Sequence, residues 1–324
     1  MKEMTLTEIA GILIGHAQNM EAATGCTAVL CPEGAVAGVV VRGGAPGTRE
    51  TDLLKPENLV EKIHAVVLAG GSAFGLDAAC GVADWLEKKG IGFDVGVTRV
   101  PIVCSAVLFD LWIGDFSVRP DAVMGAVACE NAGNSNLPLE GCVGAGAGAT
   151  VGKLLGLDRA MKSGTGAFCV EAKGLQVGAL VAVNCLGDVL NPDTGKKVAG
   201  LLTPDKKALA DTQQQMLDLY LDGSNLFSGN TTLGVIITNA ILTKAQAQKV
   251  SSMAHNGFAR AMRPAHTMYD GDTIFTLATG RIKADVSVVG MLAADVMAKA
   301  VLRAATQASS WKDVPACSGL FGRL

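Results

Sequence analysis

Short apolar runs and longer amphipathic segments follow one another along this chain and predict both strands and helices. Runs rich in β-branched residues and bounded by Gly, Asn or Asp are typical of buried strands. Segments with an apolar position every three or four residues predict helices. We expect strands at residues 36–41, 65–68, 177–183, 233–238 and 273–278, and helices at 76–88, 121–132, 205–221, 244–261 and 288–305.

Local signals at the ends of these segments refine the prediction. Pro120 and Pro204 stand directly before two of the expected helices, where a proline favours a helix start. Two polar stretches, 191–197 and 222–230, lack a core pattern and predict loops. Because strands and helices are interspersed without a strict βαβ rhythm, we expect an α+β architecture in which helices cover sheets.

The composition narrows the possible partners. The 324 residues include 40 glycines and are 49% hydrophobic but only 4% aromatic, so small residues that allow close backbone approach dominate the packing. The net charge of −3 and the lack of a basic run argue against nucleic acid or an anionic membrane as partner. No run approaches 18 consecutive apolar residues, so we expect no membrane span.

The cysteines and the N-terminus predict a cytoplasmic protein. The nine cysteines form no CxxC pair, and most lie in apolar or Gly/Ala-rich surroundings. This usage is typical of small buried hydrophobes in a reducing compartment. The first residues lack the apolar run of a signal peptide.

Several familiar catalytic motifs fail on inspection. The glycine-rich segment 144–153 resembles a phosphate-binding loop, but Ala147 and Leu154 stand where that loop needs Gly and Ser or Thr. The turn around Ser72 fits neither GxGxxG nor GxSxG. The four histidines show no metal spacing, and we expect His255 on a helix surface and neither metal nor cofactor in the protein. These failures favour a nucleophile that needs no histidine.

The pair Asn230-Thr231, just before the strand expected at 233–238, supplies such a nucleophile. We interpret the bond between them as one that the protein cuts in itself. An N-terminal Thr carries its own α-amine, whose unperturbed pKa of about 7.7–8.0 lets it serve as general base for the hydroxyl. The alternative is that Asn-Thr simply begins a strand.

Other polar residues could serve the same site. Asp270 and Asp272 flank a glycine before the strand expected at 273–278, and two carboxylates at this spacing can converge; the alternative is a plain turn. Lys153 ends the glycine-rich segment, where a surface lysine is the alternative. Asn184 ends the strand expected at 177–183, where it either faces an oxyanion or merely terminates the strand.

Taken together, these residues resemble the self-processing aminopeptidase family typified by the L-aminopeptidase/D-alanine-esterase and the β-aminopeptidases, which also contains the nylon-oligomer endo-hydrolases. The resemblance implies a single domain, 1–324, with a layered α/β/β/α sandwich of the DmpA and ornithine-acetyltransferase type. The blocks that carry it run nearly end to end: 15–16, 23–25, 42–50, 68–76, 118–121, 146–153, 229–232, 266–267 and 270–273.

The resemblance also implies roles for the nucleophile and its neighbours. Thr231 matches the family's N-terminal nucleophile, and cleavage of Asn230–Thr231 gives a large subunit, 1–230, and a small one, 231–324. Asn184 matches the asparagine assigned to the oxyanion hole.

The acidic pair and the lysine extend this match. Asp270 and Asp272 match the pair that orients the nucleophile and its amine, and Lys153 matches a lysine of the nylon-oligomer branch. Asp272 and Lys153 are both candidates for the base of self-cleavage. These residue types favour the Thr-type branch over the Ser-type β-aminopeptidases. One departure is Phe109, which stands where some relatives carry an active-site tyrosine.

The activity implied is that of an autoproteolytically activated amide hydrolase acting on small peptides, amino acid amides or ω-amino acid oligomers. Glu130, Glu140 or Asp188 could hold a substrate amine, and the sequence does not choose among them. The resemblance also implies a homo-oligomer, a tetramer of processed heterodimers. Two alternatives stay open: an acyl transferase like the ornithine acetyltransferases, and an uncleaved, non-enzymatic homologue.

Overall fold

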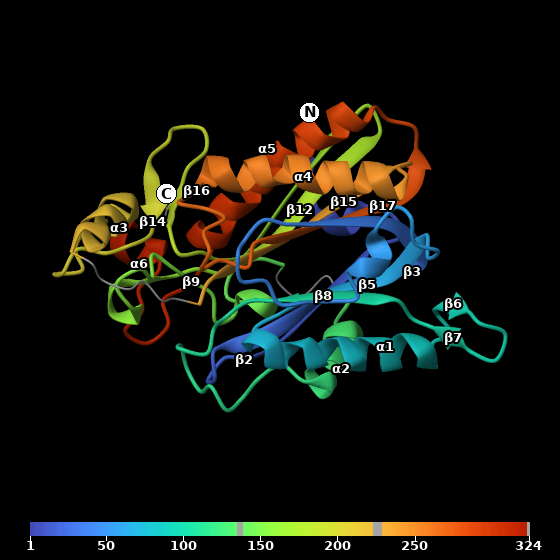
Figure 1. The fold of residues 1–324 in the computed structure, drawn as a ribbon, viewed down its shortest axis with the longest axis horizontal. Helices are drawn as coiled ribbons and strands as arrows, with labels where there is room; N and C mark the ends of the chain where they lie inside the picture. The colour runs from blue at the N-terminus through green and yellow to red at the C-terminus, as the bar shows by residue number, and fades with distance from the viewer. Residues whose placement is uncertain (135–138, 223–228, 323–324) are drawn as a thin grey trace.

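A long mixed sheet runs through the computed structural model, which describes residues 1–134, 139–222 and 229–322 (Figure 1). In this part of the chain ten strands form the sheet, with β2 paired to β3 beside the main path. In spatial order they are β1 (Lys2–Met4), β11 (Thr165–Ala172), β12 (Leu175–Asn184), β15 (Thr231–Ala240), β17 (Thr273–Ile282), β3 (Thr24–Val41), β5 (Lys62–Ala69), β8 (Val103–Val107) and β4 (Thr48–Arg49), with β2 at Leu13–Asn19.

Shorter strands and the helices complete the fold. The short strands are β6 (Phe93–Asp94), β7 (Arg99–Val100), β9 (Thr150–Val151), β10 (Met161–Lys162), β13 (Asp188–Leu190), β14 (Lys197–Ala199) and β16 (Met262–Arg263). The helices are α1 (Ala78–Lys88), α2 (Ala122–Glu130), α3 (Thr212–Leu221), α4 (Lys244–Ala261), α5 (Val286–Thr306) and α6 (Cys317–Phe321).

The bent strand β3 divides the sheet into two layers. Its second half, from Val36 to Val41, pairs with β17, whereas its first half pairs with β5 and β2. The register of the β3–β5 pair shifts between Leu30 and Ala35, where the other edge of β3 changes partner from β2 to β17. The strands β11, β12, β15 and β17 therefore lie in one layer, and β2, β5 and β8 lie in the other.

Apolar side chains that alternate along the strands fill three spaces between four layers. On β15, Leu233 and Val235 point into the core between the two sheet layers, whereas Ile236 points towards α4 and α5. On β5, Val66 faces the same central core and Val67 faces α1 and α2. Figure 1 shows α4 and α5 above the sheet and α1 and α2 below it. This arrangement confirms the predicted α+β fold with α/β/β/α layers.

The five predicted strands are all present and extend beyond the predicted runs. Four of the predicted helices are also correct within two residues at each end, as α1, α2, α4 and α5. The helix predicted from residue 205 is wrong at its start, because α3 begins only at Thr212. The hydroxyl of Thr203 instead binds Asp205 and the Ala208 amide in a turn, and Asp211 caps the helix through the Gln214 amide.

The loop predicted at 191–197 is described in full and is correct except for its last residue, whereas the loop predicted at 222–230 is described only in part. Residues 191–196 form turns before β14 begins at Lys197, and Asn191 Oδ1 accepts the Asp193 and Thr194 amides there. Of the predicted loop 222–230, residues 223–228 lie outside the described residues.

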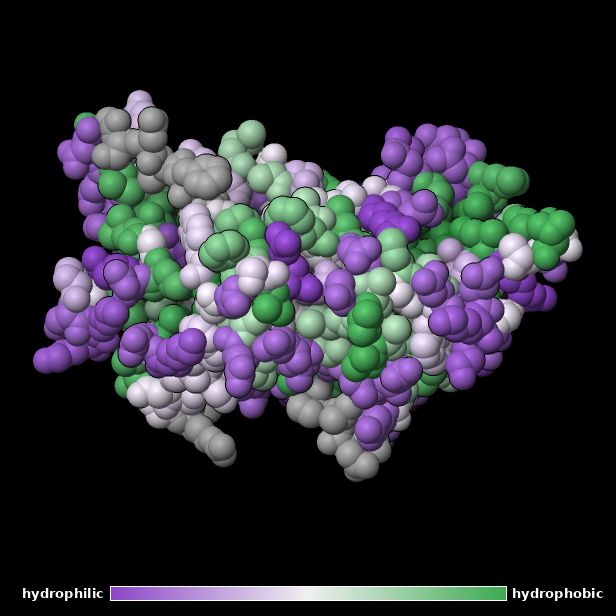
Figure 2. Space-filling model, turned by 90° about the horizontal axis from the view of Figure 1, so that it is seen from below, coloured by the Kyte–Doolittle hydropathy of each residue, from purple (hydrophilic) through white to green (hydrophobic). Residues whose placement is uncertain are grey.

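The face formed by α1 and α2 mixes hydrophilic and hydrophobic side chains (Figure 2). Hydrophobic side chains gather at its right-hand end, where the β6–β7 hairpin projects in Figure 1. Exposed residues of that hairpin include Phe93, Val95, Val97 and Val100. Within the three described segments, none of the helices combines the length and the apolar character that a bilayer crossing requires.

Candidate active site

Three chain segments that are distant in sequence meet at the start of β15. Thr231 is the first residue of this strand and lies opposite Asn184, the last residue of β12. On the other side, Asn230 forms a bridge with Asp270, just before β17. All four residues are buried. The central position of β15 thus brings the Asn230–Thr231 bond into contact with β12 and with the acidic turn.

The carbonyl of Asn230 accepts two hydrogen bonds next to the Thr231 side chain. Thr231 Oγ1 donates to the Asn230 carbonyl oxygen, and the Gly271 amide donates to the same atom at 3.1 Å. Gly271 lies so close that a Cβ there would stand 2.5 Å from Thr231 Oγ1. A glycine is therefore required at this position, and the hydroxyl of Thr231 lies against the carbonyl of the bond preceding it.

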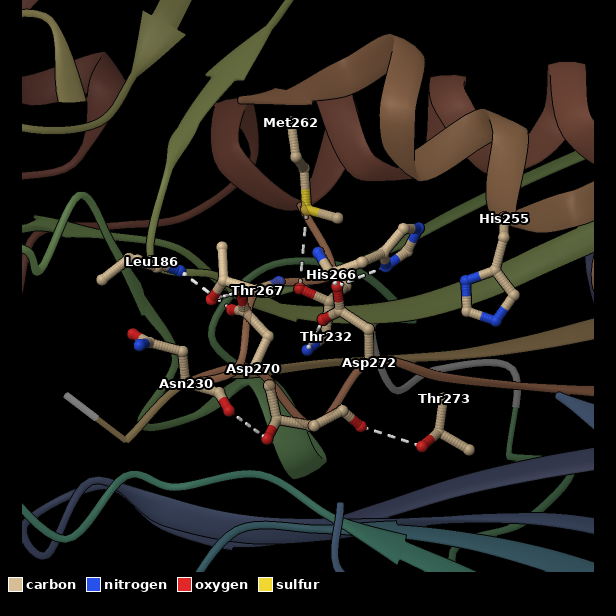
Figure 3. A network of polar contacts seen from close by, with 12 residues as sticks. Leu186, Asn230, Thr232, His255, Met262, His266, Thr267, Asp270, Asp272 and Thr273 are labelled. Carbon is tan, nitrogen blue, oxygen red and sulfur yellow. Dashed lines mark hydrogen bonds and ion pairs between the residues drawn. The ribbon is translucent and has the colours of Figure 1, made fainter. Parts of the chain in front are cut away.

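The Asp270 carboxylate is held by polar groups of two segments (Figure 3). Oδ2 accepts the Thr267 amide at 3.0 Å and the Thr267 hydroxyl at 2.5 Å, and Oδ1 faces the Leu186 amide at 3.4 Å. Burial, together with the negative charge of Asp272, raises the pKa of Asp270 to about 6.

The Asp272 carboxylate links β15 to His266, which lies six residues before Asp272 in the chain. Oδ1 accepts the amide of Thr232, the residue after the candidate nucleophile, at 2.9 Å. Oδ2 accepts the backbone amide of His266 at 3.0 Å and its ring Nδ1 at 2.8 Å. Figure 3 shows His266 next to Asp272, with His255 beside it on α4. Asp272 is therefore fixed by three donors.

Lys153 and Asn184 form the opposite side of the site. Lys153 Nζ donates to Asn184 Oδ1 at 2.6 Å and to the Asn184 backbone carbonyl at 3.0 Å. Asn184 Nδ2 donates to the Phe109 carbonyl at 2.8 Å. Burial lowers the pKa of Lys153 to about 7, although Asp270 and Asp110 partly offset this effect. A buried amine with this pKa exchanges a proton readily near neutral pH.

A pocket of about 220 Å³ opens onto Asn230 and Thr231. Its wall includes the ring of Phe109, the side chain of Met268 and the turn at Ser72. Among the described residues, the side chains that line it carry no formal charge at neutral pH. The pocket therefore suits an uncharged group beside the candidate nucleophile.

The structure thus places all five predicted catalytic residues, Thr231, Asn184, Asp270, Asp272 and Lys153, in one buried cluster. The three carboxylates considered for a substrate amine lie elsewhere. Asp188 binds Thr212 and Lys197, Glu140 accepts the Ala167 amide, and Glu130 lies at the end of α2 beside a separate surface hollow.

Sequence reasoning placed one histidine wrongly and gave a second no role. His255 was expected on a helix surface but is fully buried, and its Nε2 donates to the Val40 carbonyl. The face of α4 that carries it packs against β3 and β17, which explains the error. His266 lies in a block that carried the resemblance, yet nothing in the sequence indicated its contact with Asp272. Within the described residues, no group of three or more His, Cys, Asp or Glu is arranged to hold a metal ion.

Known proteins are similar to this chain over almost its whole length. Residues 5–315 match the model of peptidase family S58. An uncharacterized aminopeptidase of Mycobacterium leprae is 42% identical, over 98% of this chain and 94% of its own. The 6-aminohexanoate-oligomer endohydrolase of Paenarthrobacter ureafaciens is 30% identical, over 94% and 86% of the two chains.

Solved structures share the fold. The L-aminopeptidase D-Ala-esterase/amidase of Ochrobactrum anthropi matches with a TM-score of 0.70 at 18% identity, over 94% of this chain and 86% of that one. A Burkholderia β-aminopeptidase matches over the same shares with a TM-score of 0.68 at 19% identity. The family and the relatives together indicate a hydrolase of peptide or amide bonds. The chain belongs to peptidase family S58.

Proposed function

We propose that this protein is an N-terminal-threonine amide hydrolase that activates itself by cleaving the Asn230–Thr231 bond. The observation that carries the proposal is the contact between Thr231 Oγ1 and the carbonyl oxygen of Asn230, with the Gly271 amide on the same oxygen. The hydroxyl thus lies beside the peptide group whose carbon it attacks, and a local movement must turn it from the carbonyl oxygen towards the carbon.

Self-cleavage is an acyl shift followed by hydrolysis. Thr231 Oγ attacks the Asn230 carbonyl carbon, the C–N bond breaks, and water opens the resulting ester. The Gly271 amide is placed to stabilise the negative oxygen of the tetrahedral intermediate, a role worth about 2.7–4 kcal/mol. Lys153 is the better candidate for the base, because its pKa near 7 leaves a neutral amine available. Both oxygens of Asp272 are already occupied by donors.

The mature enzyme repeats this chemistry on a substrate amide. The freed α-amine of Thr231 takes the proton of Oγ, which attacks the substrate carbonyl and forms an acyl ester that water hydrolyses. The second N–H of Asn184 Nδ2 is assigned to the substrate oxyanion, and the carboxylates of Asp270 and Asp272 hold the ammonium that forms.

The pocket supports a substrate whose acyl part is uncharged. Within the part of the chain that the structure describes, the wall formed by Phe109, Met268 and their neighbours offers apolar surface and no carboxylate for a free amine. Small amides, and internal bonds of ω-amino acid oligomers, meet this requirement better than substrates with a free amine beside the scissile bond. To measure this preference, the processed protein is given substrates without a free amine and substrates with one at equal concentration. The two rates of hydrolysis are then compared.

The test of self-cleavage is an intact mass spectrum of the wild type beside Thr231→Ala. We expect fragments that meet at Asn230/Thr231 in the wild type, and one full-length species without amidase activity in the variant. Thr238→Ala, farther along the same strand, is the control and should be cleaved normally, since its hydroxyl binds the Gln176 carbonyl instead. A single full-length mass in the wild type would refute the proposal.

A further inference from the structure

His266 makes a two-point contact with one oxygen of Asp272. Its backbone amide and its ring Nδ1 both approach Oδ2, at 3.0 and 2.8 Å. A carboxylate can only accept hydrogen bonds, so Nδ1 carries the hydrogen and a neutral His266 ring is bare at Nε2. The side chain is 18% exposed, so the contact is largely shielded from water.

The backbone and the packing hold His266 in this orientation. Its φ of +60° lies in the left-handed region, which few residues other than glycine adopt. The ring packs edge-on against His255, with 4.8 Å between the ring centroids, and lies 6.1 Å from the ring of Phe258. An unfavourable backbone conformation that the surroundings maintain points to a functional constraint on the residue.

The other charged groups around His266 do not duplicate this contact. His255, from α4, donates its Nε2 hydrogen to the Val40 carbonyl, and burial lowers its pKa to about 4, so it is neutral at neutral pH. Arg42, at the end of the β3 region, donates to Ser252. Asp270 is bound by Thr267. Among the described residues, His266 is the ionisable side chain that hydrogen-bonds Asp272.

We propose that His266 is a positioning residue that fixes Asp272 and moderates the negative charge around the Thr231 amine. This inference rests on the proposed function. Asp272 Oδ1 holds the Thr232 amide, so any rotation of the carboxylate disturbs the residue after the nucleophile. Two carboxylates near an amine favour its charged form and raise its pKa, which leaves less free base for catalysis. The hydrogen bond from His266 draws part of that negative charge away from the amine.

The experiment replaces His266 by Asn, the residue that best tolerates the left-handed backbone after glycine. The processed protein is trace-acetylated with acetic anhydride across pH, and mass spectrometry of the small subunit gives the titration midpoint of the Thr231 α-amine. The rate of cleavage at Asn230–Thr231 is followed in parallel. We expect slower cleavage and a midpoint higher by about half a pH unit or more.

Two further variants interpret the result. His266→Gly removes every side-chain donor and adopts the left-handed backbone without strain, so it supplies the same measurement if the Asn variant fails to fold. His255→Gln alters the neighbouring ring without touching Asp272, so its midpoint should match the wild type. A cleavage rate and a midpoint equal to those of the wild type in the His266 variants would overturn the proposal. An uncleaved wild type would instead refute the proposed function.

Discussion

At the scale of single residues, burial decides which polar groups of the site work near neutral pH. Lys153 is fully buried beside Asn184, and its pKa is lowered to about 7 because its charged form loses hydration. Asp270 shifts the other way, to about 6, for the same reason and because Asp272 is close. The site therefore combines an amine and a carboxyl that are both easily switched between charge states at neutral pH.

The shift of Lys153 predicts a pH dependence of stability. An unfolded lysine keeps its proton up to about pH 10.5, whereas folded Lys153 releases it near 7, so the unfolded state binds more protons between these values. The free energy of unfolding should consequently rise with pH across this window, by a few kcal/mol.

The comparison uses Thr231→Ala as the parent protein, and Lys153→Met is added to it. The added substitution should abolish this rise, so the double variant gains most stability over the parent below pH 7. Urea unfolding from pH 6 to 10 measures the effect, with the exposed Lys88→Met as control. Parallel pH profiles of the parent and Lys153→Met would contradict the prediction.

At the scale of elements, close helix packing depends on small residues that the sequence places at contact points. Gly257 on α4 faces α5 so closely that a Cβ would stand 2.5 Å from the Ala294 carbonyl oxygen and 2.9 Å from the Ala298 amide. At Gly290 on α5 the obstacle is instead the side chain of Met253, at 2.3 Å. A flexible methionine can move aside, whereas helix backbone cannot.

This difference predicts different changes in stability for two similar substitutions. Gly257→Ala should force α4 and α5 apart and lower the free energy of unfolding by about 1–3 kcal/mol. Gly290→Ala should be close to neutral, because the gain in helix propensity of up to about 1 kcal/mol offsets the repacking of Met253. Thermal unfolding of both variants tests the pair, and equal losses of stability would show that the α4–α5 contact is not rigid.

At the scale of the whole molecule, the proposed cleavage cuts the chain at the centre of the sheet. Strand β15 would begin the small subunit, yet it pairs with β12 of the large subunit and shares two apolar cores with it. Strand β17 of the small subunit likewise pairs with β3 of the large one. Separating the subunits would expose this apolar surface to water, and the free-energy cost is roughly 25 cal/mol per Å² exposed.

We therefore expect the two fragments to stay together after cleavage. The processed protein should elute as one species in size-exclusion chromatography and separate into 1–230 and 231–324 only under denaturing conditions. Uncleaved Thr231→Ala should elute at the same volume. Loss of either fragment during native purification would contradict this expectation.

The sequence by itself determined most of the elements and the residue types of the candidate site. The apolar run 233–238 predicted the buried strand β15, and the helical period of 244–261 predicted α4. Asn230-Thr231 and the Asp270–Asp272 pair were visible because their chemistry depends on residue type and short spacing. The helix start at residue 212 was missed, because side-chain bonds of Thr203 and Asp211 override the proline signal.

Only the tertiary structure decided what surrounds these residues. Burial shifts the pKa of Lys153, and the packing of α4 turns His255 inwards. The fold places Glu130, Glu140 and Asp188 away from the pocket wall. The bond from His266 to Asp272 likewise depends on a left-handed backbone and on the packing of α4. Local sequence patterns show which chemical groups a segment carries. The hydration and the contacts of those groups depend on segments that are distant in sequence and come together only in the folded chain.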